Sequence, residues 1–278
     1  MNETFWEALF TNALLGRALA VGLISSVLSG VLGTFVVAKR LNALSGSISH
    51  VILAGLGGSL YCQRVLGWSL ASPLLGALIA AVLAAFAIGF IHITRGESQE
   101  GLIAAFWPLG MALGYLFIHM TPGSNLELTN YLFGNILWAS PQDIYSLIAL
   151  DALVLVVVGL FFKQFFAICL DEEMARTQGV PITRIYLLLL GLIAIGIVVM
   201  TYIVGTVLVL TLLTLPPLIA SRWTRGMLQM MVMAGGLSAL FCTLGLYLSF
   251  IADLPTGALI SLTAGCAHGM SLILTRRR

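Results

Sequence analysis

His50, Asp151 and His268 are ionisable side chains that lie inside long apolar stretches of this sequence. A neutral imidazole is a good ligand for first-row divalent metal ions. A carboxylate in an apolar segment should face other protein groups, and such residues commonly mark ion pathways or proton relays. We therefore take all three as candidate pathway residues, and His50 as the candidate metal ligand.

The position of His50 favours a place near the middle of a membrane. It follows the basic pair Lys39-Arg40 by ten residues. A helical rise of about 1.5 Å per residue puts it roughly 15 Å inward, half of a hydrocarbon core about 30 Å thick. Gly46 and Ser47 share its helix face. Transporters hold their ions near the midplane, but a structural histidine that donates to a neighbouring carbonyl fits the same pattern, and both interpretations stay open.

The other two ionisable residues carry weaker indications. Asp151, in "DIYSLIALDALVLVVVG", can be a ligand, a relay group or a structural partner. His268, in "AGCAHGM", has small neighbours that are typical of helix packing. We interpret it as a packing residue first and as a ligand second.

The elements that must position these residues are membrane helices. The chain has 278 residues, of which 60% are hydrophobic and only 9% charged, whereas a soluble domain has about 25% charged residues. At this size a water-soluble fold cannot bury so much apolar surface. The composition predicts an all-α, polytopic helical membrane protein.

Apolar stretches of about 20 residues, the length that spans a bilayer, predict about nine transmembrane helices. We place them near residues 14–37, 48–66, 70–93, 102–119, 143–166, 185–202, 204–220, 228–250 and 256–274. Eight spans are possible, because 185–220 is almost one apolar run. Nine spans with the N-terminus outside put every basic cluster in the cytoplasm, and Gly205 and Pro216-Pro217 supply plausible breaks.

Two connections between the spans are unusual. Residues 119–143 are long and aromatic, and Tyr131, Phe133 and Trp138 suit a short interfacial helix before a span that begins at Ser140-Pro141.

The most polar stretch of the chain is "LDEEMARTQGVPITR", residues 170–184. Asp171, Glu172 and Glu173 favour the start of a helix there, and Gly179 with Pro181 favours its end. We predict a short amphipathic helix on the cytoplasmic face, suited to docking, with an ordinary solvated loop as the alternative.

Motif absences argue against several functional classes. The sequence has no GxxxxGK[ST] phosphate loop, no HExxH and no GxSxG, so we expect no enzyme and no ATP hydrolysis by that route. Its four cysteines have no CxxC spacing, which predicts free thiols rather than a zinc site. A net charge of +2 gives no indication of nucleic acid.

Four segments, in order over essentially the whole chain, resemble the membrane permeases of zinc/manganese/iron-type ABC importers. They are "SGSISHVILAG" after the basic pair, "YLFGNILWASPQDI", "VGTVLVLTLLTLPPLIASRW" and "DLPTGALISL". The resemblance implies a single transmembrane domain over residues 1–278, working as a homodimer by alternating access in the bacterial cell (inner) membrane. It would import a divalent transition-metal ion (Mn, Zn or Fe) and bind no permanent cofactor.

The same resemblance implies the partners. These are a second permease copy, an extracytoplasmic metal-binding protein, and a separate cytoplasmic ATP-binding subunit that hydrolyses ATP. Residues 170–184 match the family's coupling helix, so Asp171, Glu172, Glu173 and Gly179 are the residues expected to couple to that ATPase.

The sequence departs from the family pattern at the metal site. His50 matches the family's histidine, but Gly46 stands where the family has an Asp, and Ala54 replaces a Pro. Phe106 and Trp107 lie where zinc-type members place another His. Three residues are candidates to complete the site: Asp151, His268 and Ser47. A second copy across a two-fold axis is a further source of ligands.

Two other transport functions stay open at this point, and so does the choice of metal. One is a permease of the cobalamin/siderophore/haem type, which typically has ten spans. The other is an ion-coupled secondary transporter with Asp151 and His50 as a proton relay, which would need no ATPase.

Overall fold

The computed structural model describes residues 5–68, 72–122 and 136–275, and within these ranges it is helical with no strand. The elements are α1 (Phe5–Thr11), α2 (Ala13–Ala38), α3 (Asn42–Arg64), α4 (Pro73–Arg95), α5 (Gln99–His119), η1 (Ile136–Trp138), α7 (Pro141–Leu170), α8 (Glu172–Thr177), α9 (Ile182–Val204), α10 (Thr206–Trp223), α11 (Met227–Ala252) and α12 (Thr256–Thr275). Nine helices of the described part are long and apolar enough to cross a membrane. The nine-span, all-α prediction is therefore confirmed, and the eight-span alternative is wrong.

The break that separates α9 from α10 lies at Gly205. Its φ of 92° is in the left-handed region that favours glycine. The amide of Gly205 still donates to the carbonyl of Thr201 at 3.0 Å, and its own carbonyl accepts from Val209. The chain thus turns at one residue, which is why the apolar run 185–220 contains two helices.

The prediction that Pro216-Pro217 also breaks this run is wrong, because both prolines lie inside α10. A proline in a helix leaves the carbonyl four residues earlier without its amide donor. For Pro216 that carbonyl belongs to Leu212, and the hydroxyl of Ser29 donates to it at 2.6 Å. The neighbouring helix thus supplies the missing donor, and α10 continues to Trp223.

The chain forms two compact units from interleaved segments. The first comprises Met1–Val37, Thr129–Val156 and Val199–Arg278, and the second Ala38–Leu128 and Val157–Val198. The expectation of a single transmembrane domain over 1–278 stays a prediction.

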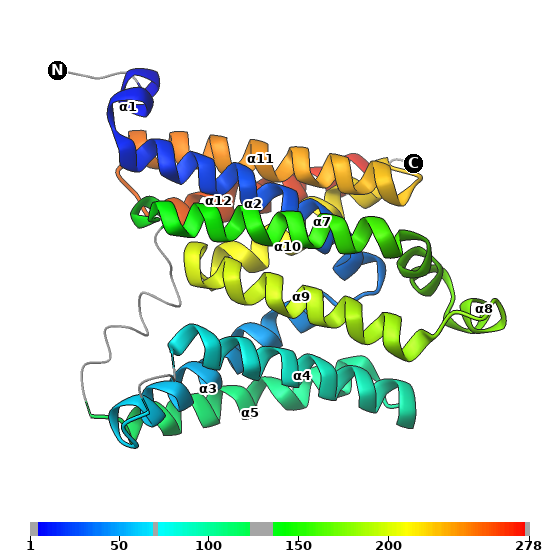
Figure 1. Ribbon diagram of the computed structural model, residues 1–278. Coiled ribbons are helices and arrows are strands. Elements are labelled where there is room, and N and C mark those ends of the chain that lie inside the picture. The colour runs from blue at the N-terminus through cyan, green and yellow to red at the C-terminus, as the bar shows by residue number, and fades with distance from the viewer. Residues whose placement is uncertain (1–4, 69–71, 123–135, 276–278) are drawn as a thin grey trace. The chain divides into compact units, whose positions relative to one another are not determined.

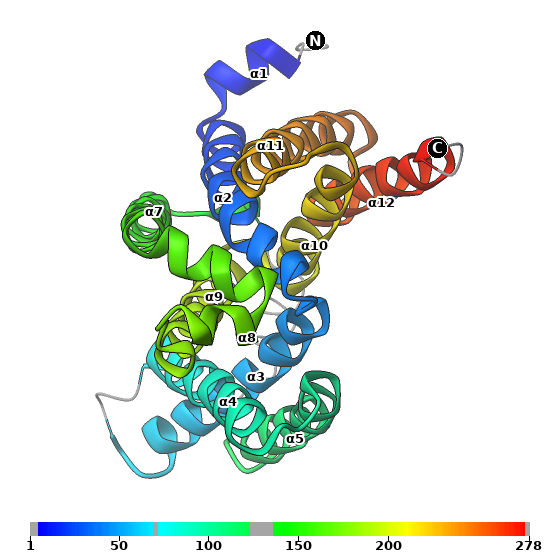
Figure 2. The same ribbon diagram turned by 90° about the vertical axis from the view of Figure 1, so that its right-hand side faces the viewer.

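In the first unit, α2 packs against α10 and α11, and α12 packs against the latter two (Figure 2). A Cβ on Gly30 of α2 would lie 2.7 Å from the carbonyl oxygen of Met231 and 2.8 Å from the Cα of Gly235, both on α11. The Ser29 and Ser238 hydroxyls are 2.8 Å apart across the same interface. Small residues thus let these backbones approach closely, as in membrane helix pairs.

In the second unit, α3 lies against both α4 and α5 (Figure 1). A Cβ on Gly55 would come within 2.2 Å of the carbonyl oxygen of Gly76 on α4. On the other side, a Cβ on Gly110 of α5 would lie 2.6 Å from the Cα of Val51. The helix that carries His50 is therefore fixed from two sides by direct backbone contact.

The connection before α7 is described only in part. The turn η1 covers Ile136–Trp138, while Tyr131 and Phe133 of the predicted interfacial helix lie outside the described residues. The next span begins at Pro141 as predicted, where the carboxylate of Asp143 accepts from both the amide and the hydroxyl of Ser140 at 2.8 Å. The Asp143 carboxylate thus provides an acceptor for the backbone amide of Ser140 at the start of the helix.

Candidate functional site

The His50 ring stacks on the indole of Trp107. The two ring centroids are 4.9 Å apart and the planes differ by 23°. His50 is half-buried, and its Nδ1 atom is buried with no hydrogen-bond partner among the residues that the structure describes. An unsatisfied buried nitrogen is costly. Trp107 thus contacts the face of the ring, and Nδ1, which no described residue contacts by a hydrogen bond, is chemically suited to bind an ion.

One face of α5 builds this stack. Ile103, Trp107, Gly110 and Gly114 recur at the three- and four-residue spacing that places side chains on one side of a helix. Gly110 and Gly114 let the backbone of α5 touch α3. Because the glycines bring the helices together, the indole of Trp107 reaches the His50 ring.

Ser47, predicted as a pathway residue, contributes to the same interface. It is fully buried, and its hydroxyl donates to the carbonyl of Ile103 at 3.2 Å. This bond joins α3 to α5 one turn from His50. Ser47 thus helps to position α3 against α5, beside the buried Gly46, and its role as a pathway residue stays a prediction.

Asp151 and His268 lie in the first unit. Asp151 of α7 is only 8% exposed, and its Oδ1 is buried with no hydrogen-bond partner within the described ranges. The same holds for the buried Nδ1 of His268 on α12. Among the residues the structure describes, no group of three His, Cys, Asp or Glu side chains is arranged to hold a metal ion. A joint site with His50 stays a prediction.

The predicted short helix at 170–184 is confirmed as α8. The Asp171 carboxylate caps it by accepting from the amides of Glu173 at 2.8 Å and Met174 at 3.1 Å. The helix ends at Thr177, and Gly179 follows with a φ of 79°. Asp171 at the start and Gly179 at the end act on neighbouring residues of the chain, which is why the sequence alone predicted both ends of the helix.

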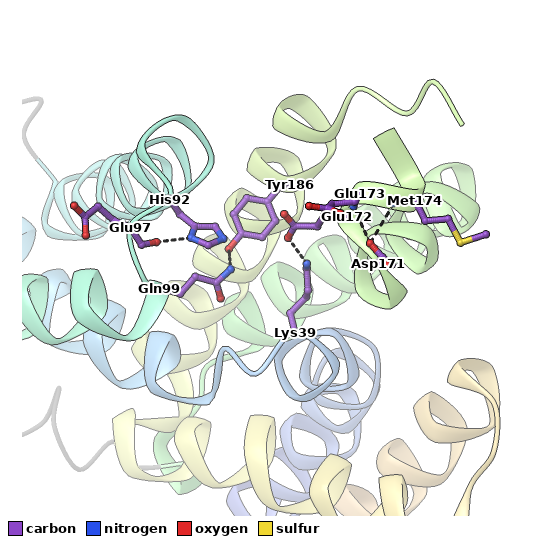
Figure 3. Close-up of polar contacts among 9 residues, drawn as sticks. All are labelled: Lys39, His92, Glu97, Gln99, Asp171, Glu172, Glu173, Met174 and Tyr186. Atoms are coloured by element: carbon purple, nitrogen blue, oxygen red, sulfur yellow. Dashed lines mark hydrogen bonds and ion pairs between the residues drawn. The ribbon is translucent and has the colours of Figure 1, made fainter. Parts of the chain in front are cut away.

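The two acidic residues of α8 differ in their surroundings. Glu172 forms an ion pair with Lys39 in which the side chains are 32% and 10% exposed (Figure 3). Glu173 is exposed, and so is Met174 at 60%. The sequence treated Glu172 and Glu173 as equivalent coupling residues, whereas only Glu173 presents its side chain outward.

Further polar groups surround this ion pair, and the sequence analysis missed them. The Nζ of Lys39 lies 5.6 Å from the ring centroid of Tyr186, whose hydroxyl accepts from the Gln99 amide at 2.8 Å (Figure 3). The His92 ring lies 6.0 Å from the Tyr186 ring, and its Nδ1 is 2.7 Å from the carbonyl oxygen of Glu97. Partners up to 133 residues apart in sequence leave no local pattern to recognise.

Comparison with known proteins decides the family. The model of the ABC 3 transport family matches residues 11–275. The chain belongs to this family. The resemblance found in the sequence is thereby confirmed, and with it the assignment to transport permeases, which are not themselves catalysts.

Relatives of this ABC 3 permease include a "Probable metal transport system membrane protein" of Chlamydia pneumoniae, 42% identical over 91% of this chain and 86% of that protein. The "Manganese transport system membrane protein MntC" of Halalkalibacterium halodurans is 27% identical over 99% of this chain and 91% of its own. Among solved structures, PsaBC from Streptococcus pneumoniae in complex with Fab matches with a TM-score of 0.81 and 26% identity, over 96% of this chain and 94% of that chain.

Proposed function

We propose that this chain is the permease subunit of an ATP-driven importer of divalent transition-metal ions, with His50 as a metal-contacting residue. The observation that carries the proposal is the His50 ring, whose buried Nδ1 has no hydrogen-bond partner in the described part of the chain while its face stacks on Trp107. Full-length relatives named for metal and manganese transport support it. The metal is the cargo of this site and not a resident cofactor.

Manganese is our first choice of ion. Relatives from Halalkalibacterium halodurans and Listeria monocytogenes are named for manganese transport. Imidazole also binds Zn²⁺ and Fe²⁺, and the glycine at position 46 removes the carboxylate that would favour Mn²⁺. We therefore propose that further oxygen ligands come from Asp151, from water or from a second copy of the chain.

The proposed assembly has four parts besides lipid. Two copies of the permease, each a single domain over residues 1–278, would enclose the pathway in a bacterial cell membrane. An ATP-binding subunit would dock on α8 at the cytoplasmic face, and an extracytoplasmic metal-binding protein would deliver the ion. ATP-driven closure would then switch the permease between outward- and inward-facing states.

Transport by the reconstituted complex tests this function. The permease and its ATPase in proteoliposomes should accumulate Mn²⁺ only when ATP and the loaded metal-binding protein are both present. Parallel assays with Zn²⁺ and Fe²⁺ show which of the three ions is accumulated fastest. Accumulation driven by a proton gradient without ATP would contradict the proposal and favour the secondary transporter, and transport of cobalamin or haem instead of metal would favour the other permease type.

Replacement of Trp107 tests the stack itself. An aromatic pair contributes about 0.5–1.5 kcal/mol beyond its buried area, so Trp107→Ala should lower Mn²⁺ uptake about 3- to 10-fold. Trp107→Phe keeps a ring against His50 and should retain most of the uptake. Equal uptake by the alanine variant and the wild type would show that the indole does not position the imidazole.

A further inference from the structure

A small polar cluster ties α8 to the beginnings of two membrane helices in the second unit. We define the Tyr186 cluster as Lys39, Glu172, Tyr186 and Gln99. Glu172 is the first residue of α8, and Lys39 lies in the turn between the end of α2 at Ala38 and the start of α3 at Asn42. Their ion pair is largely shielded on the lysine side, since the Lys39 side chain is 10% exposed. It therefore joins α8 to the start of α3.

The second half of the cluster reaches α5. Tyr186 of α9 is fully buried, and its ring lies 5.6 Å below the Lys39 ammonium, within the range of a cation–π contact. Its hydroxyl accepts from the side-chain amide of Gln99, the first residue of α5. Ser98 caps that helix by accepting from the Gly101 amide at 3.2 Å, which fixes where α5 begins. Figure 3 shows the four side chains converging from separate segments.

The two helices that meet at the cluster are those that hold the metal candidate. His50 follows Lys39 by eleven residues, and Trp107 follows Gln99 by eight. At about 1.5 Å per residue, the stacked rings lie roughly 12–17 Å along α3 and α5 from the cluster. The hydrogen bond from Ser47 to Ile103 joins the two helices before the stack, and backbone contact at Gly110 and Gly57 joins them beyond it. A displacement at the beginnings of α3 and α5 would therefore move the two rings together.

We infer that the Tyr186 cluster couples α8 to the His50–Trp107 stack, and that Lys39, Glu172, Tyr186 and Gln99 are positioning residues for transport. None of the four belongs to the His50–Trp107 stack itself. They make movement of α8 reach α3 through the ion pair and α5 through Tyr186 and Gln99. This inference rests on the proposed function and adds the link between the docking helix and the ion site.

The experiment compares metal-stimulated ATPase activity of complete complexes in proteoliposomes. Lys39→Met breaks the ion pair without changing any residue of α8. The control is Arg40→Met, which removes one positive charge from the neighbouring, exposed residue. We expect Lys39→Met to lower the Mn²⁺-stimulated part of the ATPase rate about tenfold, a typical coupling magnitude, while ATPase binding in a pull-down persists. Arg40→Met should behave as the wild type.

Two further variants separate coupling from folding. Lys39→Glu combined with Glu172→Lys restores attraction with the charges exchanged, so it should recover most of the stimulation that Lys39→Met loses. Tyr186→Phe keeps the buried ring but loses the acceptor for Gln99, and should give an intermediate loss with an unchanged melting temperature.

Full stimulation in Lys39→Met would overturn the inference. So would a loss accompanied by a lowered melting temperature and loss of the ATPase, because the pair would then be purely structural. A wild-type complex without any metal-stimulated ATPase activity would instead contradict the proposed function, which keeps the two failures distinguishable.

Discussion

His50→Ala should reduce ATP-dependent Mn²⁺ uptake by the reconstituted complex by about 100-fold or more. Loss of an outer-shell partner of a metal ligand typically costs 10–100-fold, and removal of the ligand itself should cost at least as much. No group of three metal-binding side chains exists in the described parts of the chain, so no neighbouring residue would take over. Complex assembly, measured by pull-down of the ATPase, should be unchanged.

A second histidine provides the matched control for this variant. His119 at the end of α5 is exposed, and its ring stacks near Tyr115 at 6.2 Å. His119→Ala should therefore keep wild-type uptake. If His50→Ala transports Mn²⁺ at the wild-type rate, the imidazole is a packing residue and the proposed ion site is wrong.

Positive charges introduced on the exposed face of α8 should detach the ATPase. We expect the double variant Glu173→Arg with Met174→Arg to lower co-purification of the ATP-binding subunit at least about tenfold, the effect of losing one strong interface residue. Both side chains are exposed, whereas Ala175 beside them is buried, so the change alters the docking face and spares the packed one. Transport should fall in proportion to the ATPase that remains bound.

The control for this prediction is Glu97→Arg. Glu97 is an exposed acid in the turn between α4 and α5, and its backbone carbonyl oxygen lies 2.7 Å from Nδ1 of His92. The same charge change there should leave the ATPase bound. An unchanged pull-down of the α8 double variant would reject docking at this helix, whatever the effect on uptake.

The membrane helices could be predicted from sequence because their signals are local. An apolar stretch long enough to span a bilayer identifies itself, and a glycine free to adopt a positive φ marks the break at Gly205. The same holds for α8, where the capping Asp171 and the terminal Gly179 lie within nine residues of each other. Each of these predictions depends only on neighbours along the chain.

The misjudged and missed features depend on residues far away in sequence. Pro216 stays within α10 because Ser29, 183 residues from Leu212, donates to the carbonyl that the proline leaves free. The different surroundings of Glu172 and Glu173 follow from Lys39, 133 residues from Glu172. Sequence periodicity contains no information on such pairs.

The candidate site was predicted in part. His50 was recognisable because a polar ring in an apolar segment is unusual, and Trp107 because it stands near the place of a family histidine. Their stacking was not predictable, since it requires the close approach of α3 and α5 at Gly110. The hydrogen bond from the Ser47 hydroxyl to the carbonyl of Ile103 also requires this close approach, and Ser47 stays a predicted pathway residue.

The central claim is that the imidazole of His50 binds the transported ion, and electron–nuclear double resonance of Mn²⁺ in the assembled complex tests it most directly. The ¹⁴N coupling of a bound imidazole should be present in the wild type and in His119→Ala, and absent in His50→Ala. A wild-type spectrum with oxygen ligands only, or a nitrogen coupling that persists in His50→Ala, would contradict the account.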